Sequence, residues 1–436
     1  MMKDLIKEEL HEDAAFSNFL RSQTAGGLVL LIVSVIAFII ANGPLWETYD
    51  KFSHMHASFQ IGHWDLDLDI SEWVNEGVMV FFFFLVGLEI KREFLVGELS
   101  DPRKASLAVI AAAGGMIAPA LLYTLFNIFS PGTHQGWGIP MATDIAFVIG
   151  ILSILGDRVP MALKVFLTGL AIVDDLGAIV VIALFYTENF AIMNLLMSLT
   201  FVFCSWIYGR KGGTRGVVFA LLALGCWYFI LESGIHSTIA GVLIAMTIPI
   251  HKKYELDELN HQFRMSFLDG DFEIKEHHLE ALERIIQKTE SPLERFEHKL
   301  QPWVVFLIVP VFAFFNAGVH LESHFGLRLL FQPHVLGIFF GLVLGKPLGI
   351  LFVSTLAVKR GWAILPTGVN WRAMIGVGFL AGVGFTMSLF ISILAFPIGS
   401  PNLQEAKLGI LLASLTAMLI GAPLTYKALA PESSAT

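Results

Sequence analysis

Apolar runs long enough to cross a bilayer recur along almost the whole chain, and this repetition limits what the chain can fold into. A helix needs about 20 such residues to span the hydrocarbon core. Charged residues make up only 15% of the chain, whereas soluble domains carry about a quarter. The sequence predicts an all-α polytopic membrane protein with twelve spans, centred near residues 33, 84, 117, 146, 175, 201, 222, 242, 310, 346, 383 and 416.

The distribution of Lys and Arg predicts the orientation. With both termini in the cytoplasm, 24 of the 28 Lys and Arg residues fall on the cytoplasmic side, and one, Lys346, falls within a span. Membrane proteins concentrate basic residues on that side. We therefore expect residues 1–436 to form a single transmembrane domain. No basic stripe with interleaved aromatic residues is present, which argues against binding to nucleic acid.

Two segments outside the spans have patterns of their own. In the outer loop 43–71, WDLDLDI (residues 64–70) alternates apolar and acidic residues, which predicts a strand in a short β-hairpin. The hairpin is either decorative or pairs with a second protomer. In the cytoplasmic loop 251–300, SPLE (residues 291–294) is a capping box with proline at the first helical position. The rest of that loop is interpreted as a solvated linker.

Charged residues inside the spans point to a function. Asp174 and Asp175 lie side by side in the apolar stretch LAIVDDLGAIVVIALF, and an unpaired Asp at a helix centre costs roughly 2.5–3.5 kcal/mol. Adjacent helical residues point about 100° apart, so the two carboxylates cannot easily share one partner. Asp174 is expected to pair with Lys346, which leaves Asp175 to bind a proton or a metal cation. A structural ion pair or a turn between short helices are the alternatives.

Two spans contain helix-breaking residues near their middle. GIPMATDIAF carries Pro140 before Thr143 and Asp144, and GVGFLAGVGFTMSLF carries four glycines before Thr386. Proline removes a backbone donor, and interrupted helices in both halves indicate a transporter built from inverted repeats with its site at the midplane. Close helix packing is the alternative reason for the glycines.

Five segments resemble the signatures of one family. They are ATDIAF (142–147), IVDDLGA (172–178), VGLEIKRE (86–93), GKPLGI (345–350) and GFTMSLFI (384–391), and they look like the motifs of NhaA-type bacterial sodium–proton antiporters. The resemblance covers nearly the whole chain, in order. It implies twelve helices in inverted repeats, with discontinuous fourth and eleventh helices that cross at midmembrane. It also implies a homodimer that contacts through the outer β-hairpin.

The resemblance implies roles for individual residues. The pair matching Asp174 and Asp175 is the family's shared sodium and proton site, the lysine matching Lys346 pairs with the first aspartate, and Thr143 and Asp144 match the helix crossing. A cytoplasmic entrance group and one histidine are associated with pH regulation; the matching residues here are Glu89, Arg92, Glu93, Glu297, His298 and His236. The chain departs from the family in having Glu76 where Asp is frequent, and in its longer 251–300 loop.

These observations predict an electrogenic, pH-regulated antiporter that exports Na⁺ or Li⁺ in exchange for protons. It is expected to work by alternating access in the bacterial inner membrane. Sodium prefers oxygen ligands, and protons compete for the same carboxylates. No enzyme activity and no cofactor are expected, and the partners are Na⁺, Li⁺, H⁺ and the bilayer. An intramembrane aspartyl protease and a cation channel are the alternatives.

Overall fold

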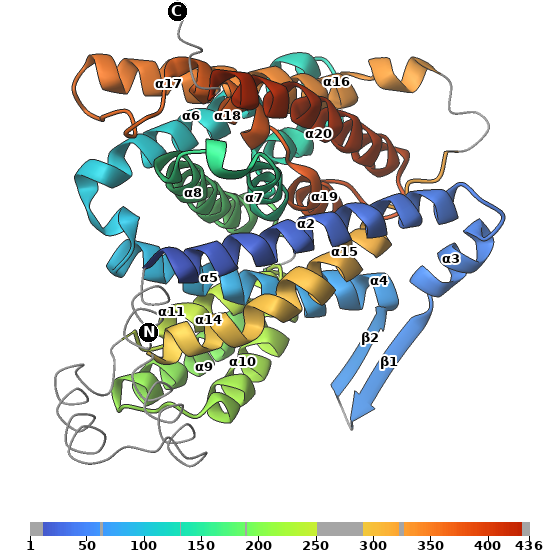
Figure 1. The fold of residues 1–436 in the computed structure, drawn as a ribbon. Coiled ribbons are helices and arrows are strands. Elements are labelled where there is room, and N and C mark those ends of the chain that lie inside the picture. The colour runs from blue at the N-terminus through green and yellow to red at the C-terminus, as the bar shows by residue number, and fades with distance from the viewer. Residues whose placement is uncertain are drawn as a thin grey trace, which may run out of the picture.

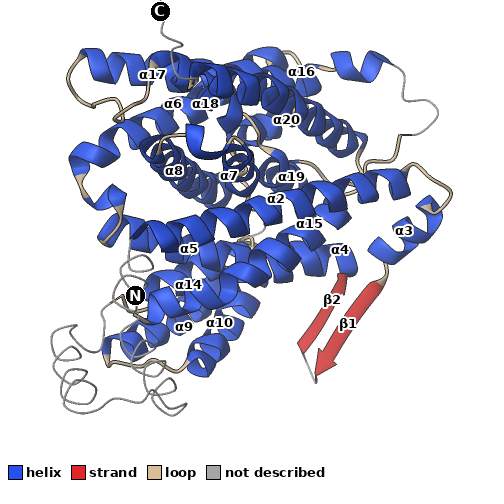
Figure 2. Cartoon of the chain, in the orientation of Figure 1, coloured by secondary structure: helices blue, strands red, loops and turns tan. Residues whose placement is uncertain are grey.

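The computed structural model describes residues 12–61, 64–130, 132–187, 190–250, 291–321 and 327–429. In these ranges the chain is mostly helical, and a two-stranded sheet projects from one edge of the helical bundle (Figure 1, Figure 2). The prediction of a mostly helical fold with membrane-spanning candidates and a short hairpin is therefore confirmed for the described residues. Of the loop predicted over 251–300, the first part lies outside the described residues.

Eight helical stretches among the described residues are long and apolar enough to cross a membrane. They are Ile70–Leu95, Ala105–Asn127, His134–Ile154, Met161–Phe185, Ile192–Arg210, Pro292–Asn316, Pro333–Lys359 and Pro401–Ala428. Four of these stretches are single helices, α6 (Pro102–Asn127), which begins three residues before its stretch, α8 (Met161–Phe185), α9 (Ile192–Arg210) and α20 (Pro401–Ala428). The other four are composite. In chain order they consist of α4 (Ile70–Glu72), η1 (Trp73–Val78) and α5 (Met79–Leu95); η3 (His134–Met141) and α7 (Ile145–Ile154); α14 (Pro292–Trp303), η5 (Val304–Ile308) and α15 (Val309–Asn316); and α16 (Pro333–Phe340), η7 (Gly341–Gly345) and α17 (Lys346–Lys359). Three short 3-10 turns, Glu98–Ser100, Gly156–Arg158 and Leu327–Phe331, lie between them.

Two further stretches are bent helix pairs. The end of α2 (Glu12–Ala41) meets α3 (Trp46–Ser53) at 112°, and α18 (Trp371–Ala381) meets α19 (Phe385–Ala395) at 44°. If each pair counts as one span, the described residues contain up to ten candidate membrane spans. The helices α10 (Gly216–Leu231) and α11 (Thr238–Thr247) are also apolar but are shorter than these spans. Eleven of the twelve predicted centres fall in helices. The one near residue 383 falls in the break between α18 and α19.

The hairpin consists of β1 (His56–Ile61) and β2 (Trp64–Asp69), paired antiparallel with His56 opposite Asp69. The strand predicted from WDLDLDI is therefore confirmed. Asp69 ends β2 and also caps α4, because its side chain accepts from the Glu72 amide while the Glu72 side chain accepts from the Asp69 amide. The hairpin thus continues directly into the helical stretch that contains α5.

The capping box predicted at SPLE is present. Ser291 accepts from the Glu294 amide, and Glu294 accepts from the Ser291 amide. With Pro292 as the first residue, α14 begins here and leads through the π-helical η5 into α15. The short segment before this span is therefore held in a defined helical entry.

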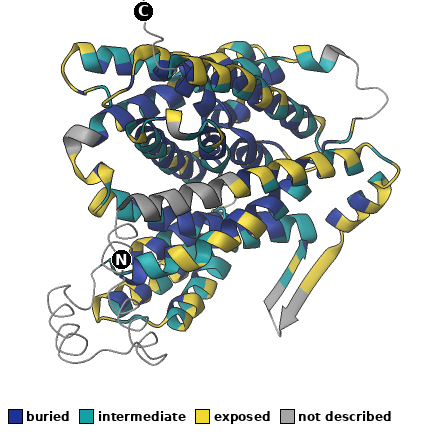
Figure 3. Cartoon of the chain, in the orientation of Figure 1, coloured by how far each residue is buried: buried dark blue, intermediate teal, exposed yellow. Residues whose placement is uncertain are grey.

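The buried residues concentrate in the middle of the bundle. Figure 1 shows α7, α8 and α19 between α6 and α17 on one side and α2 and α5 on the other, and Figure 3 shows that this centre is mostly buried. Helices α6 and α17 approach closely through Gly114 and Gly349, where a Cβ on Gly349 would lie 2.1 Å from the Gly114 carbonyl oxygen. Small residues allow this close approach. The contact packs the helix of Lys346 against α6.

Candidate functional site

Helix α8 carries Asp174 and Asp175 into the centre of the bundle. Its 25 residues contain no proline, so the backbone hydrogen bonds continue through the acidic pair, and no turn separates the two residues. Both carboxylates are buried. The alternative that the pair marks a turn between two short helices is therefore wrong.

The Lys346 ammonium lies 2.7 Å from Asp174 Oδ2, and neither side chain is exposed. Lys346 also donates to the Met141 carbonyl oxygen, which belongs to the end of η3. Thr143 Oγ1 lies 2.8 Å from the same Asp174 oxygen and 2.9 Å from the Ala381 carbonyl oxygen. The pairing predicted between Asp174 and Lys346 is thus present, and Thr143 joins it.

Two carboxylate oxygens in this centre have no hydrogen-bond partner among the described residues. They are Asp174 Oδ1 and Asp175 Oδ1, both fully buried. Buried polar atoms in proteins are nearly always satisfied, and anionic oxygens are the ligands that hard cations prefer. Asp175 also lies within electrostatic reach of Asp174, Glu89 and Asp144. Buried carboxylate oxygens of this kind can take up a proton or a hard cation.

Asp144 holds two interrupted helices together. Its Oδ1 accepts from the Phe147 amide and caps α7, while its Oδ2 accepts from the Thr386 amide and hydroxyl at 3.1 and 2.5 Å. The Asp144 amide donates to the Val383 carbonyl oxygen at 2.8 Å. The chain between Met141 and Ile145 therefore pairs with the break between α18 and α19, and each break satisfies groups that the other exposes.

A second charged group lies at the end of α5. Arg92 contacts Glu93 Oε1 and Glu297 Oε1, each at 3.1 Å, and Glu89, three residues earlier, interacts electrostatically with all three. Glu89 also lines a cavity between α2, α5, α7 and η5 that is large enough to hold water. His298 follows Glu297 in α14 and interacts electrostatically with it. The structure thus brings all five predicted entrance residues together.

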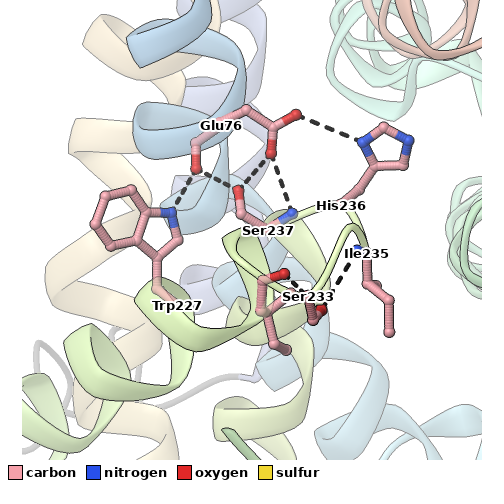
Figure 4. A network of polar contacts seen from close by, with 7 residues as sticks. Glu76, Trp227, Ser233, Ile235, His236 and Ser237 are labelled. Carbon is pink, nitrogen blue, oxygen red and sulfur yellow. Dashed lines mark hydrogen bonds and ion pairs between the residues drawn. The ribbon is translucent and has the colours of Figure 1, made fainter. Parts of the chain in front are cut away.

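The remaining predicted residue, His236, lies elsewhere, in the network of Figure 4. Its Nδ1 is 3.5 Å from Glu76 Oε1, whereas Glu76 Oε2 is 3.1 Å from the Ser237 amide and 2.7 Å from the Ser237 hydroxyl (Figure 4). The Glu76 carbonyl oxygen accepts from the Trp227 indole at 2.6 Å. Glu76 therefore holds the segment that begins α11.

Helix α5 also contacts the other end of α11. The Lys91 ammonium donates to the carbonyl oxygens of Met246 and Ile248 at 2.7 and 2.5 Å. An anionic group at the N-terminus of a helix and a cationic group at its C-terminus both stabilise the helix, because they interact favourably with its dipole. Together with Glu76, Lys91 therefore fastens both ends of α11 to one span.

Sequence reasoning did not assign Thr386 or Lys91 to these contacts. Thr386 follows a glycine-rich stretch in an apolar span. A hydroxyl group at such a position is the one feature of the sequence that could have indicated a polar contact there. Lys91 is one of the basic residues that the predicted orientation places on the cytoplasmic side. Its partners are backbone carbonyl groups of a helix more than 150 residues away, and no sequence pattern marks carbonyl groups as partners.

The sequence is similar to those of known proteins over most of its length. The sequence profile of the Na⁺/H⁺ antiporter 1 family matches residues 17–424. The chain is 45% identical to the Na⁺/H⁺ antiporter NhaA of Acidithiobacillus ferrooxidans, over 93% of this chain and 95% of that protein. It is 44% identical to the protein of the same name from Shewanella frigidimarina, over 94% and 95%. The one from Shewanella pealeana is 43% identical, over 94% and 96%.

Replacing Lys346 by Ala should destabilise the protein strongly. The change leaves the Asp174 carboxylate buried without its cation, and breaking a buried pair in this way costs about 3–5 kcal/mol. Thermal unfolding of the detergent-solubilised protein measures the loss. Lys359→Ala, at the exposed end of the same helix, is the matched control and should unfold like the wild type. An unchanged unfolding temperature for Lys346→Ala would argue against the importance of the pair.

Proposed function

Since the chain belongs to the Na⁺/H⁺ antiporter 1 family, we propose that it exports Na⁺, and also Li⁺, in exchange for protons through the site at Asp174 and Asp175. The observation that carries the proposal is the pair of buried carboxylate oxygens, Asp174 Oδ1 and Asp175 Oδ1, that have no hydrogen-bond partner in the described part of the chain. Sodium and lithium are hard cations that take oxygen ligands. The proposal requires no cofactor and no enzymatic step.

Competition for one set of oxygens couples the two ions. Asp175 holds either a proton or, with Asp174, the metal cation, and Thr143 supplies a hydroxyl beside them. Lys346 lies 2.7 Å from Asp174 and holds this carboxyl group in place beside Asp175. A carrier that crosses only in the proton-loaded or the sodium-loaded form exchanges one ion for the other.

Alternating access uses the contact between the two breaks. Asp144, Thr386 and the Val383 carbonyl oxygen link the two interrupted helices, so a movement of one changes the other. Short half-helices beside a midplane site are the arrangement that supports such movements in transporters. We place twelve spans in the membrane, in inverted repeats, with these helices as the fourth and the eleventh, crossing at midmembrane.

We assign the protein to the bacterial inner membrane, with both termini in the cytoplasm, because basic residues concentrate on the side that this orientation places inside. We also propose a homodimer that contacts through the hairpin of β1 and β2. A two-stranded sheet has unpaired backbone groups on both outer edges, and these can pair with a second copy. The mass of the detergent-solubilised protein measures the number of copies.

Asp175→Asn should abolish the exchange while the protein still inserts. The amide cannot carry the negative charge that binds the cation, nor release a proton. Proton flux driven by Na⁺ or Li⁺ in proteoliposomes measures the activity. Glu47→Gln, on the exposed face of helix α3, makes the same change from carboxylate to amide and is the control, which should retain full flux. Undiminished exchange in Asp175→Asn would overturn the site assignment.

The exchange should depend on membrane potential. If more protons enter than sodium ions leave, an inside-negative potential drives the cycle by about 2.3 kcal/mol per net charge per 100 mV. A potassium diffusion potential imposed on the same vesicles should therefore accelerate sodium export and should slow it when reversed. Equal rates at both polarities would show an electroneutral exchange.

The entrance group of Glu89, Arg92, Glu93, Glu297 and His298, together with His236, is proposed to regulate the exchange by pH. Three carboxylates surround one guanidinium, and Arg92 reaches two of them at 3.1 Å. Protons shared by this group leave as the pH rises, and the repulsion between the carboxylates then grows. The arrangement of the entrance thereby changes with pH.

Glu297→Gln should make the dependence of exchange on pH shallower. The change removes one of the carboxylates that repel each other, so less charge changes in the group. Flux over a pH series measures the profile, and Glu47→Gln, on the exposed helix α3, serves as the control. A profile identical to that of the wild type would contradict a regulatory role for this residue.

A further inference from the structure

Segment η3 (His134–Met141), which precedes Asp144 in the first interrupted span, is an unusually long 3-10 helix. It covers eight residues, whereas 3-10 helices longer than about 3–4 residues are uncommon because their hydrogen bonds have poorer geometry. Pro140 also removes a backbone donor from it. The hydrogen bonds within the segment therefore stabilise it weakly, and contacts with neighbouring helices have to hold it in place.

Two tyrosine hydroxyl groups donate hydrogen bonds to the start of η3. The Tyr123 hydroxyl, from α6, lies 2.6 Å from the carbonyl oxygen of Thr133, the N-cap residue of the segment. The Tyr186 hydroxyl, at the end of α8, lies 2.5 Å from the Gln135 carbonyl oxygen. Both tyrosines are buried, so these bonds form away from bulk water, where hydrogen bonds are electrostatically stronger.

The other end of η3 is held at the proposed ion site. Ser388 of α19 donates to the Ile139 carbonyl oxygen at 2.9 Å, and Lys346 of α17 donates to the Met141 carbonyl oxygen. Two residues further on, Thr143 contacts the carboxylate that pairs with Lys346. Side chains from α6, α8, α17 and α19 therefore fix both ends of the segment, and with them its position along its own axis.

Two glycines in η3 leave room for the tyrosine rings. A Cβ on Gly138 would lie 2.8 Å from the Tyr186 hydroxyl oxygen, and a Cβ on Gly136 would overlap the Tyr123 hydroxyl. Phenylalanine fills the same space as tyrosine except for the hydroxyl oxygen. A change from Tyr to Phe at either position therefore removes one hydrogen bond to η3 and keeps the ring that packs against it.

The position of η3 determines where two oxygen atoms of the site lie. The Met141 carbonyl oxygen accepts from the Lys346 ammonium, and the Thr143 hydroxyl contacts Asp174. Groups that bind a ligand have to be held within about 0.5 Å of their productive geometry by the residues that support them. A small displacement of η3 would therefore move both oxygens relative to Asp174 and weaken the binding of a cation there.

We propose that Tyr123 and Tyr186 are positioning residues for cation binding. By holding the start of η3, they fix its end beside the pair of Asp174 and Lys346, so that the affinity for Na⁺ depends on both hydroxyl groups. The role rests on the proposed function and deepens it, because it concerns how the same site holds its cation. The two tyrosines act on the site through the backbone of η3 rather than by contact with the cation.

Hydrogen–deuterium exchange of the full-length protein in detergent tests the anchoring without reference to transport. In Tyr123→Phe and in Tyr186→Phe, the amides of η3 should exchange several times faster than in the wild type, because a lost contact lowers the free energy of local opening. Unchanged exchange of η3 in both variants overturns the anchoring.

The matched control for this measurement is Tyr49→Phe. The Tyr49 side chain is also buried, and its hydroxyl donates to a helix carbonyl oxygen, that of Phe314, at 2.6 Å. The change therefore removes the same kind of bond at a place away from η3. It should leave exchange in η3 unchanged and accelerate exchange next to Phe314.

Titration with Na⁺ tests the effect on the cation site. A ligand that binds only the folded state raises the unfolding temperature as its concentration exceeds Kd, so thermal unfolding over a series of NaCl concentrations, at constant pH and ionic strength, gives the Kd for Na⁺. In Tyr123→Phe and in Tyr186→Phe this Kd should rise severalfold. The KM for Na⁺ in proteoliposomes should rise by a similar factor, while the maximal rate of exchange should change less.

The same control distinguishes positioning from a purely structural role. Tyr49→Phe should unfold at a lower temperature without Na⁺, as the other two variants should, but it should keep the Kd and the KM of the wild type. If Tyr123→Phe and Tyr186→Phe lose stability and also keep both constants, their hydroxyl groups serve the fold alone, and the proposal is overturned.

The binding and flux measurements separate this proposal from the proposed function. If Na⁺ stabilises the wild type and the two variants weaken this effect, but the wild type exchanges no Na⁺ for protons, the positioning role stands and the antiport fails. If the wild type exchanges the two ions but the variants keep its Kd and KM, the antiport stands and the positioning role fails.

Discussion

A lysine in the centre of an apolar bundle needs an anionic partner, and Lys346 has Asp174 at 2.7 Å. The pair connects α8 with α17, and through the Met141 carbonyl oxygen it also connects to the end of η3. Thr143 adds a third contact to the same carboxylate. Because Asp174 is engaged through one oxygen, its Oδ1 atom, like Asp175 Oδ1, has no hydrogen-bond partner among the described residues, as the proposed cargo site requires. The stability of the bundle and the composition of the site therefore depend on the same ion pair.

Much of this centre could be predicted because the relevant signals are rare. One lysine and a few aspartates stand out in spans that are otherwise apolar, so the pairing of Lys346 with Asp174 followed from having a single candidate base. The strand at residues 64–69 and the capping box at Ser291 followed from local patterns. Local periodicity and capping chemistry are encoded within a few residues. The structure reproduces them closely.

Other contacts could not be predicted, because their partners are backbone groups or residues distant in sequence. Asp144 was expected at a helix crossing, but its bonds to Thr386 and to the Val383 carbonyl oxygen require knowing how two breaks face each other. Asp144 also bears on the protease alternative. Both of its oxygens accept hydrogen bonds from protein groups, whereas a catalytic dyad needs a carboxylate that is free to meet water and substrate. That arrangement, together with the family assignment, favours a transporter.

The π-helical segment η7 (Gly341–Gly345) ends directly before Lys346. A π turn contains one more residue than an α turn, and each residue rotates the chain by about 100° around the axis. A chain with one residue fewer in this segment would direct the lysine away from Asp174, although every residue of GKPLGI would be unchanged. The number of residues between the outer end of α16 and Lys346 is therefore as much a part of the site as the lysine itself. In a sequence alignment, a single-residue gap in this stretch would signal a changed site even where all of the charged residues are retained.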